Sequence, residues 1–203
     1  MIPLVLKLLL ATRNAHKTRE LHEILGDQFE IVDLSAYPEI PETVESGMTF
    51  EENAAIKVLA VAKICRGLVV ADDSGLEVDA LDGAPGIFSA RYAGENATDS
   101  QNVMKLLREL ALRNVENEQR TARFRCVIAL ARDAELLQSF EGSVEGSIVS
   151  EQRGHGGFGY DPIFVPAGLR QTFAELLPAE KNRLSHRARA VAQLAAFLKT
   201  ERR

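Results

Sequence analysis

The sequence predicts an α/β protein with a mixed central sheet flanked by helices. In the first half of the chain, short apolar runs alternate with amphipathic stretches of helical period. In the second half, two runs that alternate apolar and polar residues are joined by a short polar turn, which is typical of an antiparallel hairpin. No internal repeat, low-complexity tract or long Gly/Ser linker divides the 203 residues. We therefore expect a single domain over residues 1–203.

The first half of the chain is expected to contribute three strands and two helices. The strands are predicted at residues 4–11, 31–34 and 68–71. Asn14 can cap a helix that runs to about Leu25 and turns its apolar residues inward. Thr49 and Glu52 match a capping box, so a second helix should begin there and run to about Cys65.

The second half is expected to supply a helix, two paired strands and a closing helix. Apolar residues mark one face of a helix near residues 103–110, and strands are predicted at 124–130 and 136–144. Ser185 can cap the closing helix. The buried stripe of that helix is predicted to consist of Val191, Leu194, Ala195 and Leu198.

The composition is that of an ordinary globular protein. Hydrophobic residues make up 46% of the chain and charged residues 26%, which allows a proper core. The formal net charge of −5 argues against broad nucleic-acid binding, which rests on a basic surface. Lys7 interrupts the apolar start of the chain, and no apolar run approaches the roughly 20 residues that span a bilayer. We expect a cytoplasmic protein with no membrane partner, in which Cys65 and Cys126 are buried free thiols.

Two adjacent carboxylates follow the third predicted strand. Asp72 and Asp73 come directly after the apolar run that ends at Ala71, so we expect them to emerge at the carboxyl end of that strand. Open α/β sheets bind their ligands at that edge. The alternative is a strand that stops at an Asp-Ser-Gly turn, because these residue types cluster in ordinary turns.

The start of the first predicted helix is a candidate anion site. A helix N-terminus presents unpaired backbone N–H groups and the positive end of the helix dipole. Thr12 adds a hydroxyl, Asn14 an amide and Lys17 a cation. The alternative is helix capping beside a solvated lysine, and the segment lacks the glycines of a P-loop.

Glu45 precedes the second predicted helix, which carries polar residues on a largely apolar surface. Thr49, Asn53 and Lys57 recur every four residues and therefore share one face. The alternative is an ordinary polar face exposed to water. Most other residues of this helix are apolar, so a polar pair such as Asn53 and Lys57 needs a reason to be there.

A glycine-rich segment, GHGGFGYDPIF at residues 154–164, favours contact with a flat ligand. Its glycines flank Phe158 and Tyr160, so that backbone and rings can approach a ligand closely. A ring stacked on a nucleobase contributes roughly 1–3 kcal/mol. The alternative is a turn between strands whose aromatic side chains pack in the core.

A basic cluster surrounds the start of the closing helix. Lys181, His186 and Arg187 offer a cation, an imidazole and a guanidinium, which suit a phosphate or a purine carbonyl. Taken alone, this segment is also compatible with a solvated basic stretch. The four histidines of the chain lack the spacing of a zinc site, and the acidic oxygen ligands point instead to magnesium.

Five motifs occur along the chain in the order ATRNAHK, ESGMTFEENAAIKV, ADDSGLEVDALDGAPGIFSARYAG, GGFGYDPIF and SHRARA, and together they span residues 10–190. Through these motifs the chain resembles the inosine triphosphate pyrophosphatases, the family of non-canonical purine nucleoside triphosphate pyrophosphatases. The resemblance implies hydrolysis of ITP, dITP or XTP to the monophosphate and pyrophosphate. With it we expect an elongated central sheet and two lobes, not separable in sequence, with the active-site cleft between them.

By motif matching, the resemblance also assigns roles to residues. Asp73 would be the general base that activates water, and Mg²⁺ would be held by Glu45 and Asp73. Asp72 and Asp73 are neighbours, so one of the two would be repelled into an outer role, and the sequence alone does not separate their roles. The substrate-binding residues would be Thr12, Asn14, Lys17, Lys57, Ser74, Phe158, Gly159, Tyr160, Asp161, Lys181, His186 and Arg187. Many members of the family carry Ser in place of Thr12, which keeps the hydroxyl group.

Two alternatives to this function stay open. An enzyme with the same phosphate site could act on other altered nucleotides, such as modified pyrimidine triphosphates. A nucleotide-binding module without turnover is a different class of protein. Such a module has no need to crowd Glu45, Asp72 and Asp73 beside a phosphate in the absence of a metal. The resemblance also implies a homodimer.

Overall fold

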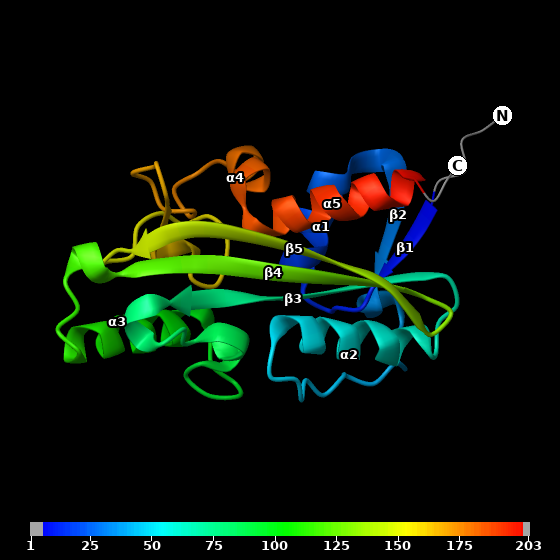
Figure 1. Ribbon diagram of the computed structural model, residues 1–203, viewed down its shortest axis with the longest axis horizontal. Helices are drawn as coiled ribbons and strands as arrows, with labels where there is room; N and C mark the ends of the chain where they lie inside the picture. The colour runs from blue at the N-terminus through cyan, green and yellow to red at the C-terminus, as the bar shows by residue number, and fades with distance from the viewer. Residues whose placement is uncertain (1–5, 201–203) are drawn as a thin grey trace. The chain divides into compact units, whose positions relative to one another are not determined.

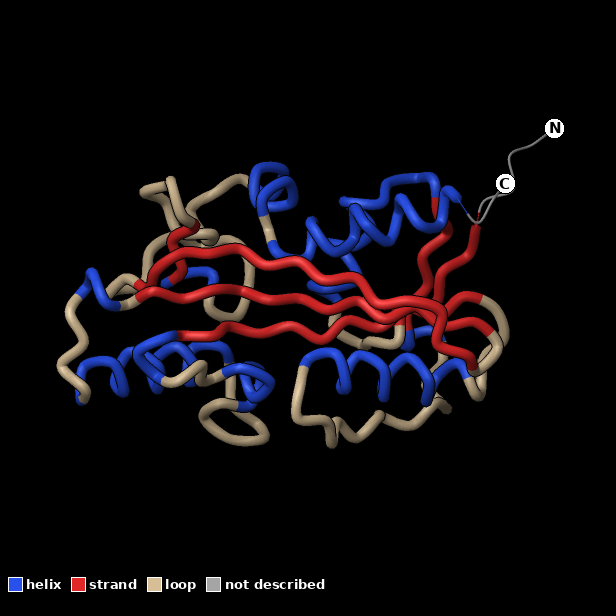
Figure 2. Tube along the Cα trace, viewed as in Figure 1, coloured by secondary structure: helices blue, strands red, loops and turns tan. Residues whose placement is uncertain are grey.

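The computed structural model describes residues 6–200 and has a mixed α/β fold (Figure 1). Its strands are β1 (Leu6–Leu10), β2 (Phe29–Asp33), β3 (Leu68–Val78), β4 (Thr121–Arg132), β5 (Glu135–Ile148) and β6 (Phe164–Pro166). Its helices are α1 (Ala15–Leu25), α2 (Phe50–Ala62), α3 (Asp99–Leu112), α4 (Pro178–Leu184) and α5 (His186–Thr200). In the described chain the strands form a six-stranded sheet in the order β2-β1-β3-β4-β5-β6 (Figure 2).

The sheet is mixed, as predicted. Strand β1 pairs in parallel with β2 and with β3, whereas β5 pairs antiparallel with β6. The neighbouring strands β4 and β5 are joined by Asp133 and Ala134, whose φ angles are 51° and 69°. Positive φ at both central residues is what a tight two-residue hairpin turn requires. The predicted hairpin is therefore confirmed, with longer strands than expected.

The chain divides into two compact units, and neither is a continuous stretch of sequence. The first unit takes the chain up to Asp73, then Cys126–Gly142, and the chain from Arg187 on. The second unit takes Ser74–Arg125 and Ser143–His186. Strands β3, β4 and β5 contribute residues to both units, which explains why no linker between them is visible in the sequence.

The core of the first unit is built on β1, β3 and the hairpin. One face of these strands contributes Leu8, Leu10, Leu68, Val70, Cys126, Ile128 and Leu130. Helices α1 and α5 cover this face with Leu21, Leu25, Val191, Leu194 and Leu198. Successive strand residues point to opposite faces, so Leu9, Val69 and Val127 point the other way, toward the side where α2 lies (Figure 1).

The core of the second unit gathers around an aromatic cluster. The ring centroid of Phe164 lies 4.7 Å from that of Phe124 and 5.2 Å from that of Phe173. Helix α3 contributes its predicted apolar face, and β3 contributes Leu76 and Val78. Such aromatic contacts add roughly 0.5–1.5 kcal/mol per pair beyond the area they bury. The cluster therefore fixes the chain that follows the glycine-rich segment.

The position of Asp72 and Asp73 differs from the expectation. Strand β3 does not stop at Ala71 but continues to Val78, so both carboxylates lie inside the strand, and the prediction that they emerge at its carboxyl end is wrong. Strand β1 pairs with β3 only as far as Val70, so the continuation lies beside its other neighbour, β4, and it buries Leu76 and Val78 at alternate positions. Tertiary pairing thus outweighs the turn preference of Asp-Ser-Gly.

Smaller differences concern the ends of elements. Helix α2 ends at Ala62, before the predicted Cys65, and Cys65 is half-buried where a buried thiol was expected. Helix α4 precedes α5 and was not anticipated. Residues 4 and 5 of the first predicted strand lie outside the described residues. Between residues 6 and 200, no helix is long and apolar enough to cross a membrane.

Candidate active site

Lys57 lies between two carboxylates in the first unit. Its Nζ is 2.7 Å from Oδ1 of Asp73 and 2.9 Å from Oε1 of Glu45. The three side chains come from α2, from β3 and from the loop before α2, and they are only 12%, 8% and 24% exposed, in that order. Charges interact more strongly where water is largely excluded. The fold therefore brings three of the sequence-predicted site residues into one charged cluster.

The Asp73 carboxyl has the properties of a proton acceptor. Burial raises its pKa, the Lys57 ammonium opposes that rise, and the Glu45 charge adds to it, with a raised pKa as the result. Its Oδ2 is buried and has no hydrogen-bond partner among the described residues. One oxygen of this carboxylate is thus held by Lys57, while the other, although buried, keeps an unused capacity to accept a hydrogen bond or a proton.

Asp72 belongs to a second charged cluster of the same unit. Its Oδ2 is 3.1 Å from Nζ of Lys17 and 3.1 Å from Nη2 of Arg187. The Arg187 guanidinium is 1% exposed and also donates a hydrogen bond to Glu20. Burial would raise the pKa of the Asp72 carboxyl, but Lys17 and Arg187 outweigh it and hold that pKa well below the usual range. Asp72 therefore stays ionised and paired, which favours Asp73 as the base.

The start of α1 combines the two interpretations of its sequence. Oδ1 of Asn14 accepts hydrogen bonds from the backbone N–H groups of His16 at 3.0 Å and Lys17 at 3.3 Å, so Asn14 is the helix cap. Oγ1 of Thr12 accepts a hydrogen bond from the Asn14 N–H at 3.1 Å. Lys17, by contrast, is not a solvated lysine, because its ammonium is paired with Asp72.

In the second unit, Lys181 and Asp161 form a buried ion pair under the glycine-rich segment. Nζ of Lys181 is 2.6 Å from Oδ2 of Asp161, which also accepts a hydrogen bond from the Phe158 N–H at 2.8 Å. The same ammonium lies 5.0 Å from the centroid of the Phe158 ring. Gly157 has φ +71°, and a Cβ there would come within 1.9 Å of the Asp161 carboxylate. The pair therefore holds the segment around Phe158, and only glycine fits at 157.

The neighbouring residues of this segment are also held in place. The Tyr160 hydroxyl donates to the Ser89 carbonyl at 3.0 Å, and the Tyr160 side chain is buried in the core of the second unit. The Gly159 N–H donates to Oδ2 of Asp99 at 2.7 Å. Tyr160 thus packs in the core, as in the alternative interpretation of the glycine-rich segment, whereas the Phe158 ring is only half-buried.

The predicted site residues fall into two groups. The first unit contains Thr12, Asn14, Lys17, Glu45, Lys57, Asp73 and Arg187. The second unit contains Ser74, Phe158, Gly159, Tyr160, Asp161, Lys181 and His186. The His186 ring stacks on Phe124 at 4.8 Å between centroids, with an interplanar angle of 9°.

Sequence reasoning missed two carboxylates that hold site residues. Glu20 is an ion-pair partner of Arg187, and Asp99 accepts a hydrogen bond from the Gly159 N–H. Glu20 lies three residues after Lys17, on the same side of α1, which was a usable signal. No local pattern links Asp99 to a glycine so far along the chain.

The carboxylates of the first unit fit a magnesium ion. In the part of the chain that the structure describes, no group of three or more His, Cys, Asp and Glu side chains could hold a metal on its own. Mg²⁺ does not need such a cage, because it is commonly held by one or two carboxylates together with phosphate oxygens and water. Glu45 and Asp73 supply the hard oxygen donors that such a site requires.

The chain thus has a mixed α/β fold, and its first unit gathers two clusters of paired cations and carboxylates. The sequence model of the Ham1 family matches residues 8–197. The chain belongs to the Ham1 family.

The similarity to individual proteins extends over almost the whole chain. This chain is 51% identical over 191 residues to a dITP/XTP pyrophosphatase of Halalkalibacterium halodurans, and the match covers 94% of this chain and 97% of that relative. It is 49% identical over 197 residues to a dITP/XTP pyrophosphatase of Desulfotalea psychrophila, covering 97% of this chain and 85% of that relative. The solved structure of a HAM1 protein from Coxiella burnetii is 42% identical, with a TM-score of 0.86, and covers 97% of this chain and 100% of that one.

Proposed function

We propose that this chain hydrolyses non-canonical purine nucleoside triphosphates, namely ITP, dITP and XTP, to the monophosphate and pyrophosphate. Such an enzyme removes deaminated purines from the nucleotide pool. The observation that carries the proposal is the pair of carboxylates, Glu45 and Asp73, joined through the Lys57 ammonium. The names of relatives that are about half identical to this chain support the same conclusion.

Glu45 and Asp73 would hold Mg²⁺, with phosphate oxygens and water in the remaining positions. When bound, the ion neutralises phosphate charge and makes a water molecule more acidic. The Lys57 ammonium keeps both carboxylates in one place, because its hydrogen bonds reach one oxygen of each. The second oxygen of Asp73 is then left for the reaction.

The phosphates would be bound at the start of α1. Lys17 supplies a charge there, and Thr12 and Asn14 fix the backbone of the helix start. Cleavage of a phosphoanhydride depends mainly on positioning and on neutralising charge, so ammonium groups close to the carboxylates are the expected arrangement. Asp72 and its buried partner Arg187 hold the Lys17 ammonium in this role.

Asp73 would act as the general base. Its carboxylate accepts a proton from the attacking water, and the water oxygen forms a bond to the α phosphorus. The bond from that phosphorus to the oxygen bridging to the β phosphorus breaks, so pyrophosphate leaves with that oxygen. The raised pKa of Asp73 suits this step, because a stronger base accepts the proton more readily at neutral pH.

The nucleoside would be bound by the second unit. The residues proposed to line its pocket are Ser74, Phe158, Gly159, Tyr160 and Asp161. The half-buried Phe158 ring is the proposed stacking partner of the base, and Lys181 and His186 are proposed to read its edge, with Arg187 as a further substrate contact. A donor that pairs with the 6-oxo group is left unpaired by a 6-amino purine, which costs roughly 1–3 kcal/mol.

The cytoplasm is the proposed location, because the nucleotides used for DNA and RNA synthesis are there. A homodimer is the proposed assembly, on the strength of the resemblance alone. Neither proposal affects the chemistry above, which uses residues of a single chain.

Pyrophosphate release from ATP, GTP, ITP, XTP and a modified pyrimidine triphosphate, with and without Mg²⁺, tests the proposal. We expect release that requires Mg²⁺ and a kcat/KM for ITP and XTP that exceeds the value for ATP by at least about tenfold. Equal kcat/KM on ATP and ITP would refute the proposed selectivity. A preference for the pyrimidine would favour the other class of altered nucleotides, and no release from any substrate would leave only a binding module.

A further inference from the structure

We propose that Asn53 is a positioning residue, which fixes the loop of residues 45–48 and thereby places the carboxylate of Glu45. This inference rests on the proposed function, in which Glu45 holds Mg²⁺. Asn53 lies on α2, one helical turn before Lys57, and its side chain is fully buried.

The contact that carries the inference is between Asn53 and the backbone of Gly47. Oδ1 of Asn53 accepts a hydrogen bond from the Gly47 N–H at 2.9 Å. Gly47 also packs directly on α2, because a Cβ there would come within 2.7 Å of both Asn53 Oδ1 and Glu52 Cβ. Since Gly47 is only two residues beyond Glu45, this contact fixes the loop close to the point where the Glu45 side chain leaves it.

Helix α2 therefore holds the loop at three points, one of which is the Met48 N–H, which donates to Oε2 of Glu52 at 2.6 Å. Asn53 holds the backbone at Gly47, and four residues later Lys57 holds the Glu45 carboxylate at 2.9 Å. Residues four apart lie on the same helix face, so one rigid element sets both contacts. Lys57 also contacts Asp73 in β3, and the distance between the two carboxylates depends on where α2 keeps the loop.

The unused half of the Asn53 amide argues against a purely stabilising role. Nδ2 is buried and has no hydrogen-bond partner among residues 6–200. The Asn53 amide is oriented with Oδ1 toward Gly47, because the Gly47 N–H is a donor and requires an acceptor there. A buried donor without a partner destabilises the folded state. A residue that serves stability alone is not expected to leave a buried donor unpaired, whereas a residue that positions a site side chain can be kept despite that cost.

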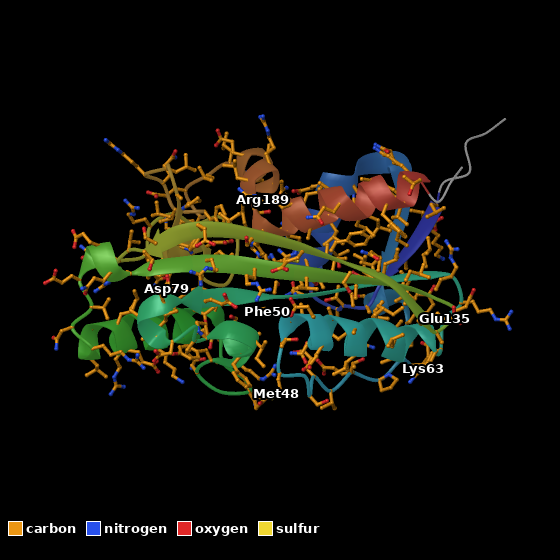
Figure 3. All side chains as sticks on the ribbon, in the orientation of Figure 1. Met48, Phe50, Lys63, Asp79, Glu135 and Arg189 are labelled. Atoms are coloured by element: carbon orange, nitrogen blue, oxygen red, sulfur yellow. The ribbon has the colours of Figure 1, made fainter. Side chains whose placement is uncertain are left out.

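The start of α2 also provides a matched control. Oγ1 of Thr49 accepts a hydrogen bond from the Glu52 N–H at 3.1 Å and so caps the helix. This contact stabilises the same helix end but does not reach Gly47. Figure 3 labels the two residues that flank Thr49, the exposed Met48 on the loop and the buried Phe50 at the start of α2. Thr49→Ala should therefore destabilise the helix end without releasing the loop.

The first measurement reads the loop without using activity. In Asn53→Ala, the amide of Gly47 loses its acceptor, so its hydrogen exchange, followed by NMR, should be at least about tenfold faster than in the wild-type protein. The second reads Mg²⁺ directly. A non-hydrolysable α,β-imido analogue of ITP is titrated into each protein by calorimetry, with and without Mg²⁺.

We expect Mg²⁺ to increase the affinity of the wild-type protein for the analogue, and Asn53→Ala to reduce that increase about 10- to 100-fold, the usual effect of losing a residue that orients a metal ligand. Affinity without Mg²⁺ should change less than about twofold, since the phosphate-binding ammonium groups are untouched. Thr49→Ala should keep the full Mg²⁺ effect. Gly47→Ala, which displaces the loop from the other side, should repeat the Asn53→Ala result and serves if Asn53→Ala does not fold.

Each other outcome overturns a defined statement. If Asn53→Ala keeps the Mg²⁺ effect, or if Thr49→Ala loses it equally, Asn53 has no positioning role of its own. If the affinity of the wild-type protein does not respond to Mg²⁺ and no pyrophosphate is released, the proposed function itself fails, and the role of Asn53 toward a metal ligand fails with it.

Discussion

Oδ1 of Asp73 lies 2.7 Å from Nζ of Lys57, while Oδ2 of the same carboxylate is buried with no hydrogen-bond partner among the described residues. One helix residue thus fixes the carboxylate and leaves its second oxygen for chemistry. The following predictions test the two charged clusters of the first unit, the segment proposed to bind the base, and the two free thiols.

Removing the Lys57 ammonium should move the acid limb of the kcat profile to higher pH. Burial raises the pKa of Asp73, Lys57 lowers it, and Glu45 raises it. Without Lys57 the pKa of Asp73 rises further. Asp73 must be ionised to act as the base, so on acidification it is protonated, and activity is lost, at a higher pH than in the wild-type protein. In Lys57→Met the limb should shift upward by at least about one pH unit. Lys57→Arg keeps a cation and should shift it less, whereas an unchanged limb in Lys57→Met would contradict the account.

Asp72→Asn should destabilise the protein strongly at neutral pH. The substitution leaves the buried guanidinium of Arg187 and the ammonium of Lys17 without their shared carboxylate. Removing one partner of a buried ion pair lowers the free energy of unfolding by about 3–5 kcal/mol. Urea unfolding at pH 7 measures this loss in the free energy of unfolding. Glu23→Gln, an exposed change on α1, is the control and should stay within about 0.5 kcal/mol of the wild type.

The pH dependence of that loss has a definite sign. The folded protein holds the pKa of Asp72 below the value of about 3.9 found in unfolded chains, so the folded state binds fewer protons in this range. The contribution of Asp72 is therefore complete above about pH 5 and declines as the pH falls toward the folded pKa. The difference between wild type and Asp72→Asn should be smaller at pH 3 than at pH 7. A difference that grows on acidification would be inconsistent with this ion pair.

Phe158→Ala should weaken nucleotide binding through the loss of a stacked ring. Stacking on a base contributes roughly 1–3 kcal/mol, so the KM for ITP should rise about 5- to 150-fold. Phe158→Tyr keeps the ring and should stay near the wild type. Phe88→Ala removes an exposed ring of the same unit and is the control. Similar KM values for Phe158→Ala and the wild type would remove Phe158 from the base pocket.

Alkylation should separate the two free thiols. Burial, with the Asp72 charge as the next cause, raises the pKa of the Cys126 thiol to about 12, and its side chain is inaccessible. Cys65 is half-buried and lies just after α2, which ends at Ala62. Iodoacetamide at pH 8 should therefore label Cys65 alone in the folded protein, and both cysteines in denaturant, as counted by mass spectrometry. Labelling of Cys126 in the folded state would contradict the described core.

Hydrophobic periodicity was sufficient to predict most elements, but not the short elements β6 and α4 or the end of β3. The paired strands and the apolar stripe of α5 follow patterns of two and of 3.6 residues, and both are confirmed. At Asp72 and Asp73 the local signal favours a turn, but the strand continues beside β4 after its pairing with β1 has ended at Val70. A single-sequence pattern carries no information about those neighbours.

The charged clusters show a similar limit of sequence reasoning. Lys17, Lys57 and Asp73 were candidates by their spacing or position, and the structure places each of them in a charged cluster. What could not be predicted is the pairing of Arg187 with Asp72, because 115 residues separate them. The Lys181–Asp161 pair spans 20 residues and a turn that only the fold defines. Burial of a cation depends on where its counter-ion lies, which is a property of the fold.

The central claim is that Asp73 activates the attacking water, and Asp73→Asn tests it most directly. The substitution keeps the size of the side chain and an oxygen acceptor for Lys57 but removes the base. Pyrophosphate release from ITP at saturating Mg²⁺ should fall by at least about 100-fold, the usual contribution of a general base, while thermal unfolding shows a folded protein. A folded Asp73→Asn protein that releases pyrophosphate at close to the wild-type rate would contradict the account.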